Sequence, residues 1–377
     1  MDLTWTPEQE EFRARAREWL AANVPDRPLP SGDTREGFAA HLDWERRLFD
    51  ARWSVVSWPE RYGGRDASLW EWLLFEEEYY RAGAPQRVTQ NGIFLLAPTI
   101  FEFGTPEQQD ALLPRMAAAQ DLWCQGWSEP GAGSDLAGLS SRANRVDGGW
   151  RLSGQKTWTT RGAFCTHLFG LFRSDPESVR HKGLTYFLVP LDADGVTVRG
   201  FGRLDGDEGF AEVFLDDVFV PDSAVLGGVG KGWSVAMATT GSERGLTLRS
   251  PGRFLESTRR LRELAEAQGA GGRLREEVVE ASMRADAYQL FTLSQVSDLV
   301  AGAKAGAESS LNKIWWSELD VLTHRTALAL RGAEAAVDEP WSRGFQFSLA
   351  GPIYAGTNEI QRTIVAERVL GLPRVGR

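Results

Sequence analysis

The sequence is poor in the side chains that most often bind transition metals or form disulfides. It has two cysteines and four histidines in 377 residues. Cys124 and Cys165 are too few and too irregularly placed for a disulfide framework or a zinc cluster, and the histidines lack ligand spacing. We therefore expect no metal site, and a reducing cytoplasm suits the two thiols.

Long apolar runs and blocks of like charge are also missing. No segment reaches eighteen uninterrupted apolar residues, and the N-terminus passes into an amphipathic stretch without the apolar run of a signal peptide. The net charge of -10 comes from residues of both signs spread along the chain, so there is no basic footprint for nucleic acid. We expect a soluble protein with no membrane span and no nucleic-acid partner.

The sequence does contain an ordinary globular composition, with 42% hydrophobic and 25% charged residues. A chain of this length is long enough for two or three hydrophobic cores.

The first ~120 residues have the element lengths typical of helical bundles. Residues 6–9, Thr-Pro-Glu-Gln, supply an N-cap, a proline at the first helical position and a capping-box glutamine, and the same device recurs at residues 105–108. Residues 69–80 form a third helical stretch without glycine or proline.

From about residue 121 the pattern changes to short runs of β-branched and aromatic residues bounded by Gly, Asp and Pro, which predicts a β domain. The predicted strands include residues 168–172, 184–191 and 213–220. Helical patterns resume after residue 230. The predicted helices there are residues 253–268, 274–304 and 308–330, with the glycine-rich residues 269–272 separating the first two. We expect an α+β chain with an all-α domain at 1–118, a β domain at 119–228 and an α-helical domain at 229–377.

Three motifs stand in one order along this chain. Residues 127–135 read Trp-Ser-Glu-Pro-Gly-Ala-Gly-Ser-Asp, residues 155–160 read Gln-Lys-Thr-Trp-Thr-Thr, and residues 354–362 read Tyr-Ala-Gly-Thr-Asn-Glu-Ile-Gln-Arg. Together they resemble the signatures of the acyl-CoA dehydrogenase family. The resemblance covers essentially the whole chain and implies an N-terminal helical domain, a central β-barrel-like domain and a C-terminal four-helix bundle.

A flavin ring needs a flat apolar platform, donors for its polar edge and a hydrogen-bond partner near N5. The resemblance implies that Gln125, Trp127 and Ser128 lie beside the pyrimidine and ribityl portions of FAD. It also implies that Trp158 approaches the ring face and Thr160 approaches N5. The alternative is that Trp127 and Trp158 only fill a core, which is the usual role of one tryptophan among the fifteen here.

The glycines of the first motif, Gly131 and Gly133, are interpreted as turn residues that allow close approach of the backbone. Ser134 resembles the family position that meets the acyl-thioester arm. At the third motif, Thr357 and Glu359 resemble the family's contacts to the phosphate-ribityl side of the flavin.

Thr357 and Glu359 stand at the opening of a predicted helix, residues 358–370. A helix N-terminus favours a pyrophosphate through its free N–H groups and its dipole. The alternative is that Thr357 is only the N-cap of that helix, and the two interpretations are compatible.

Ala355 occupies the position at which most family members carry the catalytic glutamate. Glu243, in the segment Gly-Ser-Glu-Arg-Gly at 241–245, lies where isovaleryl- and long-chain-type members place their glutamate instead. The resemblance therefore implies that Glu243 is the base, and that the backbone N–H of Ala355 helps to polarise the thioester carbonyl. Arg244 is assigned to the substrate pocket or to CoA. The alternative for Glu243 and Arg244 is an exposed helical ion pair.

Two segments with which homotetrameric members reach a neighbouring subunit's FAD are not matched here, at residues 267–274 and 341–347. We therefore expect either a homo-oligomer with a different pocket or a heterotetramer with a homologous second subunit.

The resemblance implies FAD-dependent α,β-dehydrogenation of an acyl thioester, with CoA as the expected carrier and electrons passing to an electron-transfer-flavoprotein-type acceptor. The alternatives are a non-catalytic or half-catalytic subunit of a heteromeric enzyme, and a flavin oxidase or monooxygenase on the same fold.

Overall fold

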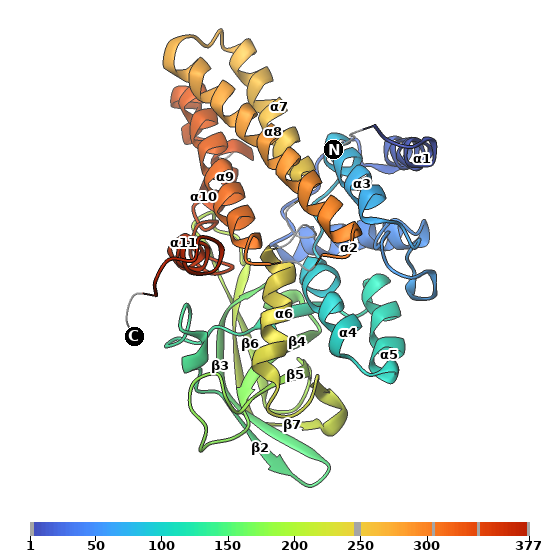
Figure 1. Ribbon diagram of the computed structural model, residues 1–377, viewed down its shortest axis with the longest axis vertical. Coiled ribbons are helices and arrows are strands. Elements are labelled where there is room, and N and C mark those ends of the chain that lie inside the picture. The colour runs from blue at the N-terminus through green and yellow to red at the C-terminus, as the bar shows by residue number, and fades with distance from the viewer. Residues whose placement is uncertain (1–3, 245–249, 304–305, 338–339, 375–377) are drawn as a thin grey trace. The chain divides into compact units, whose positions relative to one another are not determined.

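The computed structural model describes residues 4–244, 250–303, 306–337 and 340–374, except the side chains of residues 242–244 (Figure 1). The chain divides into two compact units, which are treated separately below. The helical unit comprises Met1–Asp26, Ala67–Ala84 and Arg244–Arg377, and the sheet unit comprises Arg27–Asp66 and Pro85–Glu243. Among the described residues, no helix has the length and apolar character needed to cross a bilayer.

The helical unit is built from long antiparallel helices and two short ones near its C-terminal end. They are α1 (Pro7–Asn23), α3 (Leu69–Arg81), α7 (Pro251–Ala267), α8 (Gly272–Val300), α9 (Ser309–Arg331), α10 (Pro340–Ser348) and α11 (Asn358–Ile364). The predicted helices at 253–268, 274–304 and 308–330 correspond to α7, α8 and α9. The predicted helix at 358–370 is only partly α-helical, because α11 passes into a π-helical turn at Val365–Val369.

Local sequence chemistry explains where α1 begins and which face it buries. The Thr6 hydroxyl accepts a hydrogen bond from the N–H of Gln9, and Oε1 of Gln9 accepts one from the N–H of Thr6, so the predicted capping box is confirmed. Phe12, Ala16 and Leu20 repeat at helical spacing and are all buried. They lie on one face, and α1 packs against α3.

The core of the helical unit lies between α7, α8 and α9, which run side by side in Figure 1. Phe254 of α7 meets Tyr288 of α8 edge to face, with ring centroids 5.5 Å apart. Trp316 and Leu319 of α9 complete the same cluster. Its apolar side chains are almost fully removed from water, so hydrophobic burial is the main force that holds the three helices together.

The sheet unit joins one sheet to four helices. The helices are α2 (Arg35–Asp50), α4 (Ala97–Phe103), α5 (Pro106–Ala117) and α6 (Gly232–Arg244), and a π-helical turn at Asn91–Leu96 precedes α4. The strands are β1 (Trp123–Gly126), β2 (Arg142–Val146), β3 (Gly149–Thr160), β4 (His167–Arg173), β5 (Leu184–Pro190), β6 (Val196–Phe201), β7 (Phe210–Pro221) and β8 (Val225–Leu226). The predicted strands at 168–172, 184–191 and 213–220 correspond to β4, β5 and β7.

The sheet follows the order β6-β7-β3-β2-β4-β5-β8, and β1 pairs with β4 in parallel. Strands β3 and β7 are its longest members and pair antiparallel along most of their length. Alternate residues of both strands, including Leu152, Val213 and Val218, enter one apolar core with Leu168 and Phe187. The α+β class and the mixture of helical parts with a central sheet are confirmed. The three proposed domain boundaries stay a prediction.

Candidate flavin site

A β-bulge at the end of β3 presents Trp158 to solvent. Two residues, Thr157 and Trp158, stand on β3 where the paired strand β7 has one, so the register shifts between Lys156 and Thr159. Trp158 has a backbone φ of 56°, in the left-handed region, and its side chain is 61% exposed. Such a backbone costs a residue other than glycine on the order of 1–3 kcal/mol, and bulges commonly re-aim a side chain at a functional site. The interpretation of Trp158 as core filler is therefore wrong.

Two phenylalanines support the exposed indole. Phe201 of β6 and Phe210 of β7 both meet Trp158 edge to face, with ring centroids at 5.3 and 5.6 Å. Edge-to-face contacts fix the orientation of a ring beyond what burial alone achieves. The indole is therefore held in a fixed orientation while most of its surface stays exposed.

The residues after Trp158 are held as firmly. Thr160 is half-buried and pairs with Phe210 of β7. Arg161 has a left-handed φ of 55°, and its N–H donates to the carbonyl of Gly209 at 2.9 Å. Pairing with β7 therefore resumes directly after the bulge, and the Arg161 hydrogen bond extends this connection past the end of the strand.

The first motif lies against the bulge. The N–H of Thr157 donates to the carbonyl of Ser128 at 2.9 Å, which joins the two motifs directly. Trp127 is buried and meets Tyr186 edge to face at 6.3 Å. Its indole N–H is buried without an acceptor in the described part of the chain. Gln125 lies on β1, opposite Phe169 of β4.

A buried ion pair connects the same two motifs at a second point. The Lys156 ammonium is 2.8 Å from Oε1 of Glu129 and donates to the carbonyl of Leu171 at 2.7 Å. The Glu129 carboxylate also accepts hydrogen bonds from the Ser140–Ser141 segment, at 2.6 to 3.3 Å. Both side chains of the pair are almost fully buried.

The charges of this pair are set by burial and by mutual attraction. Burial raises the pKa of the Glu129 carboxyl, but the Lys156 ammonium and hydrogen bonds from the two serines outweigh it and hold the pKa at about 2. Burial lowers the pKa of Lys156 to about 8, against the opposing attraction of Glu129. Both groups are therefore ionised at pH 7. Neither was among the residues expected from the sequence.

Strand β3 passes so close to the segment that binds Glu129 that position 154 requires a glycine. Gly154 sits at another register shift of β3, with a φ of 149°. A Cβ at this position would lie 2.2 Å from Oγ of Ser141, a residue whose N–H binds Glu129. Any larger residue would push Ser141 away from the buried carboxylate.

The first motif forms the predicted turn, with Gly131 in it and Gly133 directly after it. Neither Gly131 nor Gly133 has a positive φ, and a Cβ at either position meets no described atom within 4 Å. The turn closes instead through reciprocal backbone bonds between Glu129 and Ala132 at 3.0 Å. Its geometry therefore does not need glycine. Ser134 is exposed on this turn.

The third motif lies in the helical unit and is also strained. Ala355 has a φ of 58° and Gly356 one of 75°, so two consecutive residues are left-handed. The buried side chain of Gln361 donates from Nε2 to both of their carbonyls, at 3.1 and 3.3 Å. Thr357 caps α11 by accepting from the N–H of Ile360, so the N-cap interpretation is confirmed.

Glu359 is exposed in the first turn of α11. A hydrogen bond from its own backbone N–H and one from Thr357 hold its pKa below the usual range. It is therefore ionised at neutral pH.

Side chains of α9 hold the first residue of α11, Asn358, in place. The fully buried Lys313 of α9 donates from Nζ to Oδ1 of Asn358 at 2.7 Å, and Ser317 donates to the same oxygen at 3.2 Å. Asn358 donates in turn to Glu318 at 3.4 Å. The sequence analysis missed Lys313, although a lysine inside an otherwise apolar helical face signals a buried charge.

Glu243 and Arg244 fall on the last turn of α6. Their side chains lie outside the described residues, so their assignment stays a prediction. Within the sheet unit, β1, which carries Gln125, contacts β3, and the bond from Thr157 to Ser128 joins the segment of Trp127 and Ser128 to that of Trp158 and Thr160. In the helical unit, Ala355, Thr357 and Glu359 lie in one short stretch.

The fit to a flavin rests on what the sheet unit offers. It has an exposed aromatic surface on a rigid bulge, a buried indole N–H with no acceptor among the described residues, and a half-buried threonine hydroxyl, which are the kinds of group that a flavin ring needs. In the described part of the chain, no group of three or more His, Cys, Asp or Glu side chains is placed to hold a metal ion.

Comparison with known families agrees with this architecture. The chain matches the N-terminal, middle and C-terminal domains of acyl-CoA dehydrogenases over residues 6–120, 124–218 and 230–370. It belongs to the acyl-CoA dehydrogenase family and is an oxidoreductase of lipid metabolism that uses a flavin.

Particular relatives extend the comparison. The chain is 38% identical over 391 aligned positions to acyl-CoA dehydrogenase IpdE1 of Mycolicibacterium smegmatis, covering 97% of this chain and 98% of the relative. A solved structure described as the Tcur3481-Tcur3483 steroid ACAD is 25% identical, with a TM-score of 0.89 and full coverage of both chains. The ChsE4-ChsE5 complex of Mycobacterium tuberculosis is 27% identical, with a TM-score of 0.84 and full coverage of both chains.

Proposed function

We propose that this chain is an FAD-dependent acyl-thioester α,β-dehydrogenase, with an acyl-CoA as its expected substrate. The observation that carries the proposal is the exposed Trp158 on its rigid bulge, in a chain whose three parts all match the family. Strained backbone of this kind clusters at ligand sites, where a bound ring would cover the exposed indole.

The residues assigned to FAD come from all three motifs. Trp158 faces the ring, Thr160 approaches N5, and Trp127 supplies a donor to the polar edge. The full proposed set is Gln125, Trp127, Ser128, Trp158, Thr160, Thr357 and Glu359. Ser134 and Arg244 are assigned to the acyl-thioester arm and the carrier.

The proposed chemistry divides between the protein and its cofactor. Glu243 removes the weakly acidic α-proton, a task that suits a carboxylate whose proton affinity is raised by apolar surroundings. The Ala355 N–H donates to the thioester carbonyl and stabilises the charge that develops there. The flavin supplies the acceptor for the hydride that leaves the β-carbon.

The test is Glu243→Gln, which conserves shape and removes the proton acceptor. We expect flavin reduction by an acyl-CoA to slow by on the order of a hundredfold or more while FAD stays bound. The matched control is Glu263→Gln on the exposed surface of α7, which should reduce flavin at the parental rate. A Glu243→Gln protein that also reduces flavin at that rate places the base elsewhere. Rapid oxygen consumption during turnover would favour an oxidase instead of a dehydrogenase that passes electrons to a flavoprotein acceptor.

A second proposal concerns assembly, namely that the chain completes its FAD site with a homologous second subunit. It is supported by the two unmatched segments, which lie around the α7–α8 connection and in α10, and by two similar structures, Tcur3481-Tcur3483 and ChsE4-ChsE5, whose names each pair two proteins. The loss of charge-assisted hydrogen bonds to a pyrophosphate, about 1.5–3 kcal/mol each, would weaken FAD retention by the chain alone.

Expression of the chain alone, with FAD per protomer and solution mass measured together, tests this assembly. An empty or half-filled assembly that a homologous chain completes supports the partner. One FAD per chain in a stable homo-oligomer contradicts it.

A further inference from the structure

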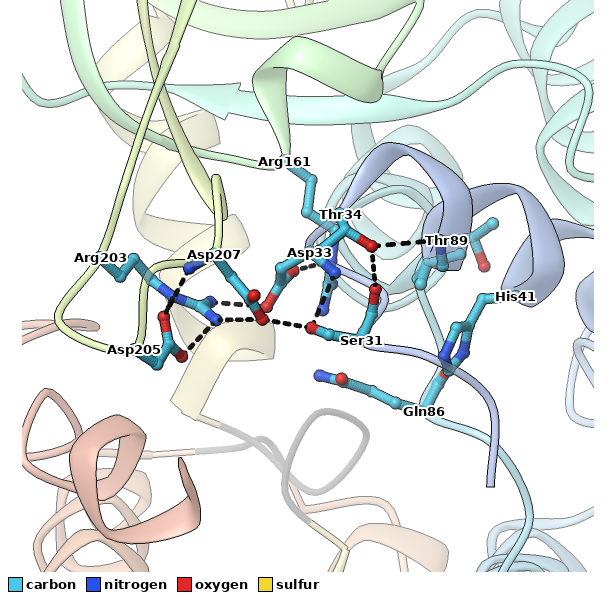
Figure 2. Close-up of polar contacts among 12 residues, drawn as sticks. Ser31, Asp33, Thr34, His41, Gln86, Thr89, Arg161, Arg203, Asp205 and Asp207 are labelled. Carbon is cyan, nitrogen blue, oxygen red and sulfur yellow. Dashed lines mark hydrogen bonds and ion pairs between the residues drawn. The ribbon is translucent and has the colours of Figure 1, made fainter. Parts of the chain in front are cut away.

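A buried cluster of acidic and basic side chains includes Arg161, which follows Trp158 by three residues (Figure 2). It comprises Asp33, Arg161, Arg203, Asp205 and Asp207, and we call it the Asp33 cluster. Its members come from three stretches of the sheet unit that are far apart in sequence. Every member has a side chain that is at most 13% exposed. Charged side chains are almost never buried unless they are paired, and breaking such a pair by removing one partner is costly.

Asp33 is the centre of this cluster, because each of its oxygens binds a different guanidinium. Oδ1 accepts from Nε of Arg161 at 2.6 Å, and Oδ2 accepts from Nη1 of Arg203 at 2.6 Å. Burial raises the pKa of the Asp33 carboxyl, but the two guanidiniums outweigh it and hold the pKa below its usual value. Asp33 is therefore ionised and joins the two arginines.

The short stretch that carries Asp33 is itself fixed. His41 contacts the carbonyl of Pro30 through Nε2 at 3.0 Å, and the Thr34 hydroxyl donates to the carbonyl of Ser31 at 2.9 Å. Thr34 also caps α2 by accepting from the N–H of Gly37. Asp33 thus projects from a rigid turn.

Arg203 ties the cluster to the aromatic support of Trp158. Its guanidinium also binds Asp205 at 2.8 Å and lies 6.0 Å from the centroid of Phe210. Phe210 is one of the two rings that flank Trp158, and Arg161 follows Trp158 by three residues. Asp33 is therefore linked to the bulge in two ways, through the side chain of Arg161 on the same strand segment and through Arg203 and its contact with Phe210.

Arg161 depends strongly on Asp33. Its Nη1 is buried and has no acceptor within the described residues. The bond from Nε to Asp33 is the ion pair that compensates this buried charge. Without that carboxylate the guanidinium would have to move toward water and would draw the left-handed backbone of residue 161 with it.

We propose that Asp33 is a positioning residue for the flavin site. Through Arg161 and Arg203, it fixes the segment of residues 157–161, which contains the bulge and the Trp158 indole. The proposal rests on the assignment of Trp158 and Thr160 to FAD. A merely structural role would lower stability and leave flavin binding unchanged.

The test compares three variants of the assembled protein, together with a partner subunit if the parent requires one. Asp33→Asn removes the charge and keeps the shape. Arg161→Asn removes the guanidinium and keeps a residue that tolerates a left-handed φ. The third variant combines both changes. The matched control is Asp222→Asn, which breaks the exposed Arg145–Asp222 pair of the same unit.

Three quantities are measured: the Kd for FAD by titration, the visible spectrum of the bound flavin, and amide hydrogen exchange over residues 155–164. We expect Asp33→Asn to raise the Kd about tenfold, to change the band shape and to speed exchange at the bulge. Arg161→Asn should change the same three quantities to a smaller extent, because it breaks only one of the two links to Asp33. The double variant should match Asp33→Asn, since loss of the Asp33 charge already removes the link to Arg161. The control should stay within twofold of the parent.

The outcomes separate this proposal from the one on which it rests. Parental Kd, spectrum and exchange in both single variants overturn the positioning role, even if the melting temperature falls. If Asp33→Asn does not fold, Arg161→Asn decides by the same three measurements. A parent protein that binds no FAD in any assembly overturns the flavin assignment itself, and faster exchange in the variants would then report only a structural cluster.

Discussion

The Thr157–Arg161 segment of the sheet unit and the Tyr354–Thr357 segment of the helical unit both hold left-handed residues other than glycine, but different chemistry stabilises them. Buried ion pairs hold the first, through Lys156 and Arg161. Amide hydrogen bonds hold the second, since Gln361 binds the carbonyls of residues 355 and 356. Backbone strain persists only where its surroundings over-determine it, and this protein meets that condition in two ways.

The contrast follows from where each segment lies. The side chains that flank the bulge, those of Lys156 and Arg161, enter a core where only an opposite charge compensates a buried ion. A turn before a helix leaves carbonyl groups that neutral side chains satisfy. We therefore expect the first segment to be more sensitive to loss of a partner and to acid than the second.

The largest effect should come from Lys156→Met, which leaves the Glu129 carboxylate buried without its ammonium partner. Removal of one member of a buried pair costs about 3–5 kcal/mol, so the free energy of unfolding in denaturant should fall by that order. The control is Arg180→Met, which breaks an exposed pair with Asp135 and should cost at most about 1 kcal/mol. Equal costs for the two variants would show that burial does not govern this pair.

Acid should weaken the first segment next. The pKa of Glu129 is about 2 in the folded protein against an ordinary value of 4.5. Because the folded pKa is the lower one, this stabilisation is present above about pH 4.5 and is lost as the pH falls toward 2. Glu129→Gln should flatten that part of the curve of stability against pH. An unchanged slope between pH 4.5 and 2 would mean that other carboxylates dominate.

A smaller effect is expected in the second segment from Gln361→Ala. The change removes both hydrogen bonds to the carbonyls of the half-buried residues 355 and 356, and the loss of such bonds costs about 1–3 kcal/mol. Denaturant unfolding measures this loss, with Gln268→Ala at the exposed end of α7 as the control. A loss as large as that of Lys156→Met would remove the distinction between the two segments.

The smallest effect should be a gain. Ala355→Gly relieves the left-handed strain at a φ of 58° and should stabilise the protein by at most about 1 kcal/mol, since glycine also gives the unfolded chain more freedom. Thermal unfolding checks the sign. A destabilised Ala355→Gly protein would indicate that the methyl group makes packing contacts that outweigh the strain.

Short-range chemistry made much of this fold predictable. The capping boxes at Thr6 and Thr105 join residues three apart, so they were visible as sequence patterns and proved correct. Long helical patterns predicted α7, α8 and α9. Short runs of β-branched and aromatic residues, bounded by Gly, Asp and Pro, predicted β4, β5 and β7. The order of the three motifs was enough to indicate the family.

The sequence by itself thus determined the element types, the family and the candidate residues, because each depends on neighbours along the chain. Only the tertiary structure decided that a bulge exposes Trp158, that Lys156 pairs with Glu129 across 27 residues, and that Asp33 meets Arg161 across 128. Such pairs form where distant strands and turns pack together, and burial in the packed state, which no local pattern records, gives them their strength.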